Sequence, residues 1–414
     1  MNVFDKIFRG DKTIWCIFIA LCVISLLEVF SASSTIVYRQ HSHWGPVLRH
    51  AVFLLIGFGS VMFLQRVQTR YLSALLLLLP ISWILLIVTM FIGADVNGAQ
   101  RWLGIGAFTI QPSEFTKLAL IGFVAFFLSK LKDTNDQQIF KILLGGILVS
   151  CALIVTENLS TACLLFVATY LMMFIGQVPM KKLGLIALVG ITVVVLLFGT
   201  LSLIPKSAAK EYLPDRFATW KGRLDRYSSP ESAEGDSLTT EYKITDDNYQ
   251  VSHAKIAIAN GGIIGLPGSG TERDFLPQAY SDFIFAIIVE EMGLIGGLVT
   301  LLLYVALMIR AGVLASKCEK TFPRYLLLGC ALLITIQALA NMSVAVNLIP
   351  VTGQPLPLIS RGGTSTIITC IYFGIILACS NAKEDEETLA VAEDVSKADL
   401  EDEILGLSDT NKII

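Results

Sequence analysis

Long apolar runs alternate with short polar segments along most of the chain. Ten of these runs reach the roughly 17–25 residues that a helix needs to cross the hydrocarbon core of a bilayer. They cover residues 14–34, 47–64, 71–92, 112–129, 139–155, 159–175, 183–204, 282–309, 325–346 and 363–379. The pattern therefore predicts an all-α polytopic membrane protein with ten transmembrane helices.

The boundary between the fifth and sixth runs is the least marked, because only Glu157, Asn158 and Ser160 interrupt them. A single helix across both runs would be roughly 55 Å long at 1.5 Å per residue, against a hydrocarbon core of about 30 Å. We therefore expect two helices that meet at Glu157 and Asn158.

The distribution of Lys and Arg supports this topology. If the N-terminus is cytoplasmic, most basic residues fall in cytoplasmic loops, and the short outer loops carry only Arg39, Arg49, Arg101 and Arg361. This asymmetry follows the positive-inside rule. It predicts cytoplasmic N- and C-termini and a large extracytoplasmic loop, residues 205–281, between spans seven and eight.

Composition separates a membrane domain from a short polar tail. The chain is 54% hydrophobic and 16% charged, whereas soluble domains average about 25% charged residues. Residues 1–380 form the predicted ten-span membrane domain. Residues 381–414 are acidic and lack aromatic residues, which predicts a disordered, solvated cytoplasmic tail or a tail that binds a partner.

Two helices are expected inside the outer loop. In the first, apolar residues recur at helical spacing among basic ones, which is typical of an amphipathic helix at a membrane surface. These apolar residues are Leu213, Phe217, Trp220 and Leu224. The second helix is expected over residues 251–260, ended by the Gly261–Gly262 pair.

Asp282 stands where this loop meets the eighth apolar run. A carboxylate is costly to desolvate at a membrane boundary, so an acid at such a place is a candidate functional group. We interpret Asp282 as a candidate general base on the outer side. Glu290 and Glu291 follow in the same run and are interpreted as packing or gating groups.

Two other outer segments hold candidate residues. Glu114 and Lys117 are three positions apart, so they can pair on one helix face, and Arg101 precedes them in the same loop. Residues 347–365 contain Arg361, three prolines and three glycines, a pattern that favours non-helical backbone lining a cavity. The alternatives are an ion pair that only locks helices together and a rigid turn without a chemical role. The four histidines form no convincing metal site.

Several motifs follow one another along nearly the whole chain. They are SAS at 31–33, NG-x-x-RW and QPSE-x-x-K within 97–117, RF and W within 216–220, LP-x-A-x-x-DFIFA and EE-x-G within 276–293, and TG-x-PLP and S-x-GG-x-S within 352–365. With these motifs the chain resembles the SEDS family of membrane proteins, which includes FtsW and RodA, and it most resembles FtsW. It departs from the family at ENLST (157–161), where PDLGT is usual, at Arg361, where an aromatic residue is common, and by an insertion at 227–248.

The resemblance implies a peptidoglycan glycosyltransferase that polymerises lipid II by inverting transfer on the outer face of the membrane. The family's essential aspartate falls on Asp282, which would take the proton from the acceptor sugar 4-hydroxyl. A divalent cation (Mg or Mn) at Asp282 could assist. The other substrate-binding candidates, which include the cations that would balance the leaving pyrophosphate, are Arg101, Glu114, Lys117, Arg216, Arg223 and Arg361.

The resemblance also implies partners and a location. We expect a class B penicillin-binding protein transpeptidase and other divisome membrane proteins, and no nucleic acid. The expected location is the bacterial inner (cytoplasmic) membrane, at the division septum. The alternatives are a RodA-like polymerase of cell elongation, a flippase or transporter for a lipid-linked sugar, and a scaffold without activity.

Overall fold

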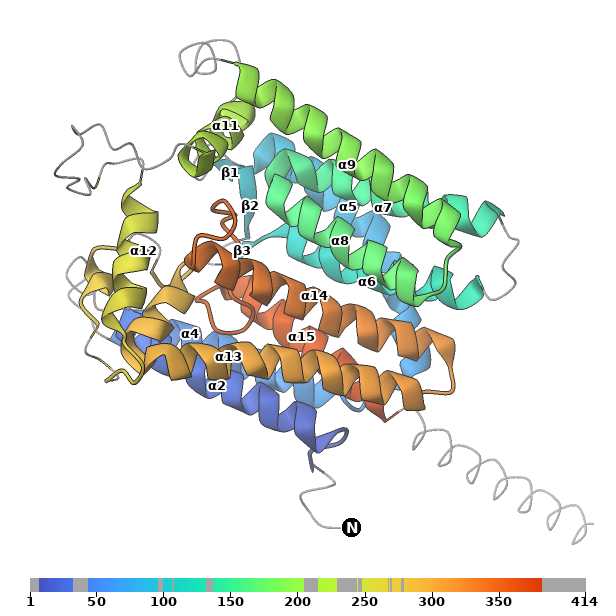
Figure 1. Cartoon of the computed structure of the whole chain (residues 1–414). Helices are drawn as coiled ribbons and strands as arrows, with labels where there is room; N and C mark the ends of the chain where they lie inside the picture. The colour runs from blue at the N-terminus through green and yellow to red at the C-terminus, as the bar shows by residue number, and fades with distance from the viewer. Residues whose placement is uncertain are drawn as a thin grey trace, which may run out of the picture.

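The computed structural model describes residues 7–32, 44–95, 100–105, 108–131, 137–204, 215–228, 244, 248–266, 268, 270–276 and 279–381. Long helices run side by side through the bundle (Figure 1). They are α2 (Lys12–Ala32), α4 (Trp44–Leu64), α5 (Leu75–Ile92), α6 (Pro112–Lys130), α7 (Gln137–Glu157), α8 (Leu159–Ile175), α9 (Met180–Leu203), α13 (Ile284–Lys317), α14 (Thr321–Ala345) and α15 (Gly363–Ser380). The predicted acidic tail, residues 382–414, lies outside the described residues.

The chain is a multi-pass membrane protein in the part that the structure describes. Nine helices there are long and apolar enough to cross a membrane, counting η1 (Thr69–Ala74) with α5, and the apolar helix α8 has 17 residues. The predicted break between the fifth and sixth runs is confirmed, because α7 ends at Glu157 and Asn158 begins α8. The Asn158 side chain accepts hydrogen bonds from the amides of Ser160 (3.0 Å) and Thr161 (3.4 Å). These bonds satisfy amides that the first turn of α8 leaves without helical partners.

Helix α14 lies at the centre of the bundle, where it packs against α6, α8, α13 and α15. In α14, 83% of an apolar stretch of 18 residues is buried inside the protein, against 6% of the corresponding stretch in α9. Helix α9 packs only lightly on α8 and α11 (Asp215–Ser228). The bundle therefore has a buried centre and a side that presents apolar residues outward.

The described residues are mainly helical, but the expectation of an all-α fold is wrong at residues 94–95, 100–105 and 108–110. Three short antiparallel strands form there, β1 (Ala94–Asp95), β2 (Gln100–Ile105) and β3 (Phe108–Ile110), with Leu103 opposite Ile110. The sequence analysis treated this segment as a loop because the runs are short. Trp102, Leu103 and Ile105 are nonetheless residues of a kind that favours strands. The strands lie at the same end of the bundle as α11 and α12 (Tyr249–Asn260) (Figure 1).

Helix α13 differs from the predicted eighth span in two ways. It begins at Ile284, after Asp282, and it extends to Lys317. It is also broken at Gly293, where φ is 72° and ψ is −177°. Carbonyls from the outer loop substitute for helical partners at the break. The amide of Leu294 donates to Gly262 O (3.0 Å) and that of Ile295 donates to Ile263 O (3.2 Å).

Glycines allow this loop to touch the backbone of α13. A Cβ added to Gly261 would lie 1.9 Å from the carbonyl oxygen of Val289, and one added to Gly265 would lie 2.5 Å from that of Glu291. No larger residue fits such distances without a shift. The two helices expected in the outer loop are confirmed as α11 and α12, and α12 ends at Asn260 as the glycine pair predicted.

Candidate active site

Asp282 lies in the turn that precedes α13, and hydrogen bonds hold the backbone of this turn in place. Three consecutive carbonyls accept bonds from α14 and the α14–α15 loop: Tyr280 O from the amide of Arg361 (2.9 Å), Ser281 O from Ser360 Oγ (2.6 Å) and Asp282 O from Asn341 Nδ2 (2.9 Å). The Asp282 carboxylate is half-buried and accepts a bond from Ser281 Oγ (3.1 Å). The turn therefore fixes the position of a partly exposed acid.

The α14–α15 loop, residues 346–362, is the second part of the site. It has the irregular backbone that its prolines and glycines predicted, with positive φ at Asn347 (58°), Gly353 (68°) and Leu358 (69°). Within the loop, Ser360 Oγ accepts from the amide of Leu356 (2.7 Å). The loop is thus an ordered wall beside the Asp282 turn.

Arg361 contributes a positive charge beside Tyr280, two residues before Asp282 in the chain. Its guanidinium carbon lies 5.4 Å from the centroid of the Tyr280 ring, a cation–π contact. Burial lowers the pKa of Arg361 from its ordinary value, Tyr280 opposes this effect, and the charge of Arg49 lowers the pKa further. Two nearby guanidinium groups repel one another, so an anion bound beside them would be stabilised.

Helix α11 brings Arg223 to the α14–α15 loop. Arg223 Nη1 donates to Thr352 O (3.2 Å), and Tyr227 OH donates to Leu348 O (2.9 Å). A Cβ added to Gly353 would lie 3.6 Å from both Arg223 Nη2 and Asp282 Oδ2. The predicted acid and one predicted cation therefore converge beside Gly353, whose positive φ of 68° favours glycine.

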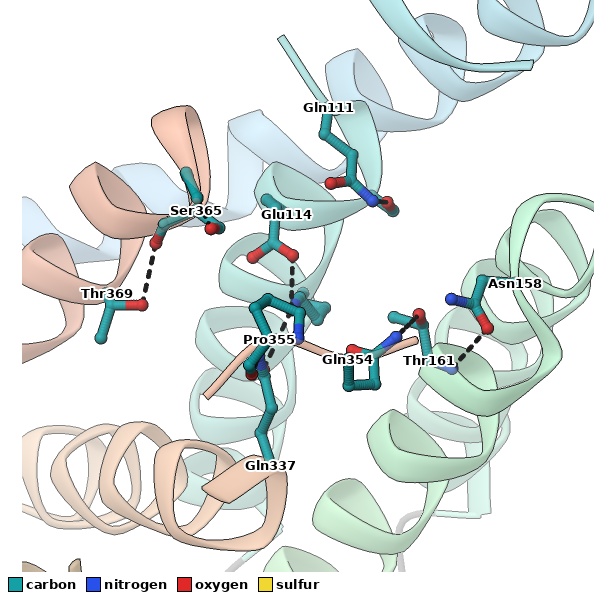
Figure 2. Close-up of polar contacts among 12 residues, drawn as sticks. Gln111, Glu114, Asn158, Thr161, Gln337, Gln354, Pro355, Ser365 and Thr369 are labelled. Carbon is teal, nitrogen blue, oxygen red and sulfur yellow. Dashed lines mark hydrogen bonds and ion pairs between the residues drawn. The ribbon is translucent and has the colours of Figure 1, made fainter. Parts of the chain in front are cut away.

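Glu114 and Lys117 belong to a buried network that reaches the α14–α15 loop. Figure 2 shows Glu114, Gln337 and Pro355 close together. The ion pair of Glu114 and Lys117 is 2.8 Å long, and these two residues are 5% and 2% exposed. Lys117 Nζ also donates to Gln337 Oε1 (3.1 Å), and Gln337 Nε2 donates to Pro355 O (3.1 Å). The pair thus supports the loop from inside the bundle, which favours the alternative in which it locks structural elements together.

The remaining sequence predictions for this site are two cations, Arg101 and Arg216, and a divalent metal ion. Arg101 lies in β2 and Arg216 in α11, but both side chains fall outside the described residues. No group of three or more His, Cys, Asp or Glu that could hold a metal ion occurs in the described part of the chain.

Comparisons with known proteins agree with the motifs. A profile of the cell cycle protein family (FtsW, RodA and SpoVE) matches residues 11–385. A probable peptidoglycan glycosyltransferase FtsW of Haemophilus influenzae is 32% identical over 380 residues, which cover 89% of each chain. The chain belongs to the FtsW/RodA/SpoVE family. Stage V sporulation protein E of Bacillus subtilis is 30% identical over 380 residues, which cover 89% of this chain and 96% of that protein.

Solved structures share the fold of this family member. A chain from a study of polymerization and crosslinking by a peptidoglycan synthase complex has a TM-score of 0.67 and 24% identity, and the match covers 90% of this chain and 98% of that one. The rod shape determining protein RodA of Thermus thermophilus has a TM-score of 0.62 and 22% identity, with 90% and 97% covered.

The sequence analysis did not identify the buried polar residues that hydrogen-bond to the Asp282 turn and the α14–α15 loop. Gln337, Asn341, Gln354 and Ser360 are all buried and hydrogen-bonded. For Gln337 and Asn341 a signal was available, since polar side chains inside an apolar span are costly unless they have partners. The sequence could not show which partners they meet.

Glu290 and Glu291 fasten the outer loop to α13, which agrees with their interpretation as packing groups. Glu290 Oε1 accepts from the amides of Thr271 (2.8 Å) and Glu272 (3.0 Å). Glu291 Oε1 pairs with Arg273 Nη1 (3.1 Å). These carboxylates are therefore occupied by protein partners near the break at Gly293.

Proposed function

We propose that this chain is a peptidoglycan glycosyltransferase that polymerises lipid II into glycan strands by inverting transfer. Curated FtsW relatives are named as probable peptidoglycan glycosyltransferases. The observation that carries the proposal is the convergence of Asp282 and Arg223 at Gly353. Arg361 directly follows Ser360, which bonds to the turn that holds Asp282. One carboxylate beside cations suits a reaction that needs one base and produces an anionic leaving group.

Asp282 acts as the general base in the proposed reaction. Its carboxylate accepts the proton of the acceptor sugar 4-hydroxyl while that oxygen attacks the anomeric carbon of the donor. The bond from that carbon to the pyrophosphate breaks in the same step, so the configuration inverts once. General base catalysis of this kind contributes about 10²–10⁴ in rate.

Arg223 and Arg361 balance the charge of the departing pyrophosphate, with Arg101 and Arg216 as further candidates. Fixed cations placed where negative charge develops lower the barrier because they need no reorganisation during the reaction. Glu114 and Lys117 contribute by supporting the loop that carries Arg361, through Gln337 and Pro355.

The protein acts in the inner membrane of a bacterium, with ten spans, cytoplasmic termini and the 205–281 loop on the outer side. The nine long apolar helices and the 17-residue α8 support this count. A class B penicillin-binding protein is the proposed partner, as the solved relative comes from a complex that coordinates polymerization with crosslinking. The named FtsW relatives favour division over elongation.

Reconstitution with purified substrate tests this function. The protein is placed in vesicles with labelled lipid II, with and without a class B penicillin-binding protein. Glycan strands that a muramidase digests are the expected product. A flippase would instead move labelled lipid II between leaflets and yield no polymer in either condition, and that outcome would overturn the proposal.

A further inference from the structure

Asn341 bonds to the backbone on both sides of the candidate site. Its side-chain nitrogen donates to Asp282 O (2.9 Å) and to Gln354 O (2.8 Å). One amide group on α14 therefore ties the turn that carries the acid to the loop that faces it. Among the described hydrogen bonds, it is the one side-chain group that donates to both segments.

We propose that Asn341 is a positioning residue that fixes the backbone of Asp282 at the distance and angle that the glycosyl transfer needs. The proposal rests on the function proposed above. Asn341 does not touch the reacting atoms. It acts through the backbone, and Ser360 has the parallel role one residue earlier, at Ser281 O.

Burial makes this bridge rigid and gives it one orientation. Asn341 is fully buried, with 0% exposure, so each bond that it makes competes with no water. If its amide were reversed, the side-chain oxygen would face two carbonyl oxygens, which cannot donate to it. The observed orientation uses both N–H groups and is therefore the stable one.

The chemistry explains why such a bridge matters. A general base must lie within about 2.6–3.2 Å of the proton it removes, and a misplacement of about 1 Å can cost roughly 10²-fold in rate. Asp282 lies in a turn outside α13, so the helix alone does not fix its position. The hydrogen bonds to Tyr280, Ser281 and Asp282 supply that constraint from other elements.

Kinetics of the full-length protein in vesicles test the proposal. Asn341→Leu keeps the approximate volume and removes both donors. We expect kcat to fall by about tenfold or more while KM for lipid II changes little, because substrate groups are untouched. The matched control is Thr335→Val on the same helix. The buried Thr335 hydroxyl donates to Ala331 O (2.8 Å), lies 3.3 Å from Tyr304 O and, among the described residues, makes no hydrogen bond to the turn. A loss no larger than that of the control would overturn the proposal.

Asn341→Asp provides a readout that a packing role would not move. When the introduced carboxyl is protonated it can donate one hydrogen bond, and when ionised it can donate none. The ratio of its kcat to that of the wild type should therefore rise as the pH falls, whereas the ratio for Asn341→Leu should stay flat. Equal, flat ratios for both variants would contradict the positioning role.

Ser360 gives a second, independent pair of variants. Ser360→Ala removes the donor to Ser281 O, and Ser360→Thr keeps a hydroxyl. We expect the Thr variant to recover part of the kcat that the Ala variant loses.

Hydrogen exchange at residues 281–283 separates failure of this inference from failure of the proposed function. Faster exchange in Asn341→Leu than in Thr335→Val supports the bridge whatever reaction the site performs. Unchanged exchange would reject the bridge even in an active polymerase.

Discussion

Helices α14 and α9 both have the apolar composition of a membrane span, yet they use their polar residues in opposite ways. In α9 the hydroxyls of Thr192, Thr200 and Ser202 bond only to carbonyls of their own helix. In α14, Gln337 and Asn341 reach the loop and turn that form the candidate site. Helix α14 thus positions the candidate site through polar groups that bond to other elements. Helix α9 presents an apolar surface, and these hydroxyls bond within the helix.

Burial explains the difference. Helix α14 has 83% of its apolar stretch buried and therefore contacts protein on most sides. Helix α9 has only 6% of its apolar stretch buried. An unbonded polar group in hydrocarbon costs several kcal/mol, so a hydroxyl on an outward face is satisfied at least cost within its own turn. The comparison predicts that equivalent substitutions have large effects near α14 and small effects in α9.

The largest effect should come from the ion pair beside α14. Lys117→Met leaves the buried carboxylate of Glu114 without its partner, and such a loss costs about 3–5 kcal/mol. We expect a clear drop in the thermal unfolding temperature in detergent. The double variant Glu114→Gln/Lys117→Met should recover part of it, since no charge then stays buried. A single variant as stable as the wild type would contradict the supporting role of the pair.

The glycine contact between the outer loop and α13 should give the next effect. Gly261→Ala places a Cβ 1.9 Å from the Val289 carbonyl oxygen, and overpacking of this kind costs about 1–3 kcal/mol. The matched control is Gly184→Ala in α9, where a Cβ would meet nothing within 4 Å. That change should be neutral or stabilising, because Ala favours helix by up to about 1 kcal/mol. Similar shifts of the unfolding temperature for both variants would contradict the prediction that the Gly261 contact is tight and the Gly184 position is open.

The cap of α8 should give a smaller effect. Asn158→Ala removes the acceptor for the amides of Ser160 and Thr161, at a cost of about 0.5–2 kcal/mol. Thr192→Val in α9 removes a hydroxyl that serves only its own helix, so its effect should be smaller. Thermal unfolding of the two variants, measured in the same detergent, tests the order.

The smallest effect should be a pH-dependent one at the opposite end of the bundle. Burial raises the pKa of Asp11, but hydrogen bonds from Arg310 and nearby amides outweigh it and hold that pKa below its usual range. The stabilisation is therefore full above the ordinary pKa of aspartate and is lost as the pH falls through the lowered value. Asp11→Asn should lower the unfolding temperature at neutral pH, and the difference should shrink in acid. A difference that stays constant with pH would contradict this assignment.

The sequence predicted most of the helices because a membrane span imposes its length and apolarity on the residues themselves. It located the break at Asn158 for the same reason, since one helix would have been too long for a bilayer. It missed the strands at 94–110, which are short and depend on contacts with neighbouring elements. It also began the eighth span at Asp282, two residues before α13 starts, because the apolar pattern does not reveal that the turn is held by Asn341 and Ser360.

For the site too, the sequence predicted local features but not contacts between residues far apart in the chain. A family motif identified Asp282, and the charges of the outer segments made Arg223 and Arg361 candidates. The structure brings Asp282 and Arg223 together at Gly353. The Glu114–Lys117 spacing predicted their ion pair, which the structure confirms. Its link to Pro355 through Gln337 joins residues far apart in the chain, and periodicity carries no information on such a contact.

Replacement of one carboxylate is the most direct test of the account. Asp282→Asn keeps the shape of the side chain and removes its basicity, and Asp225→Asn serves as a control, because that carboxylate pairs with Lys221 on α11. The account predicts that Asp282→Asn binds lipid II as the wild type does, yet forms glycan strands at least about 10²-fold more slowly, while the control stays active. Polymerisation by Asp282→Asn at the wild-type rate would contradict the central claim.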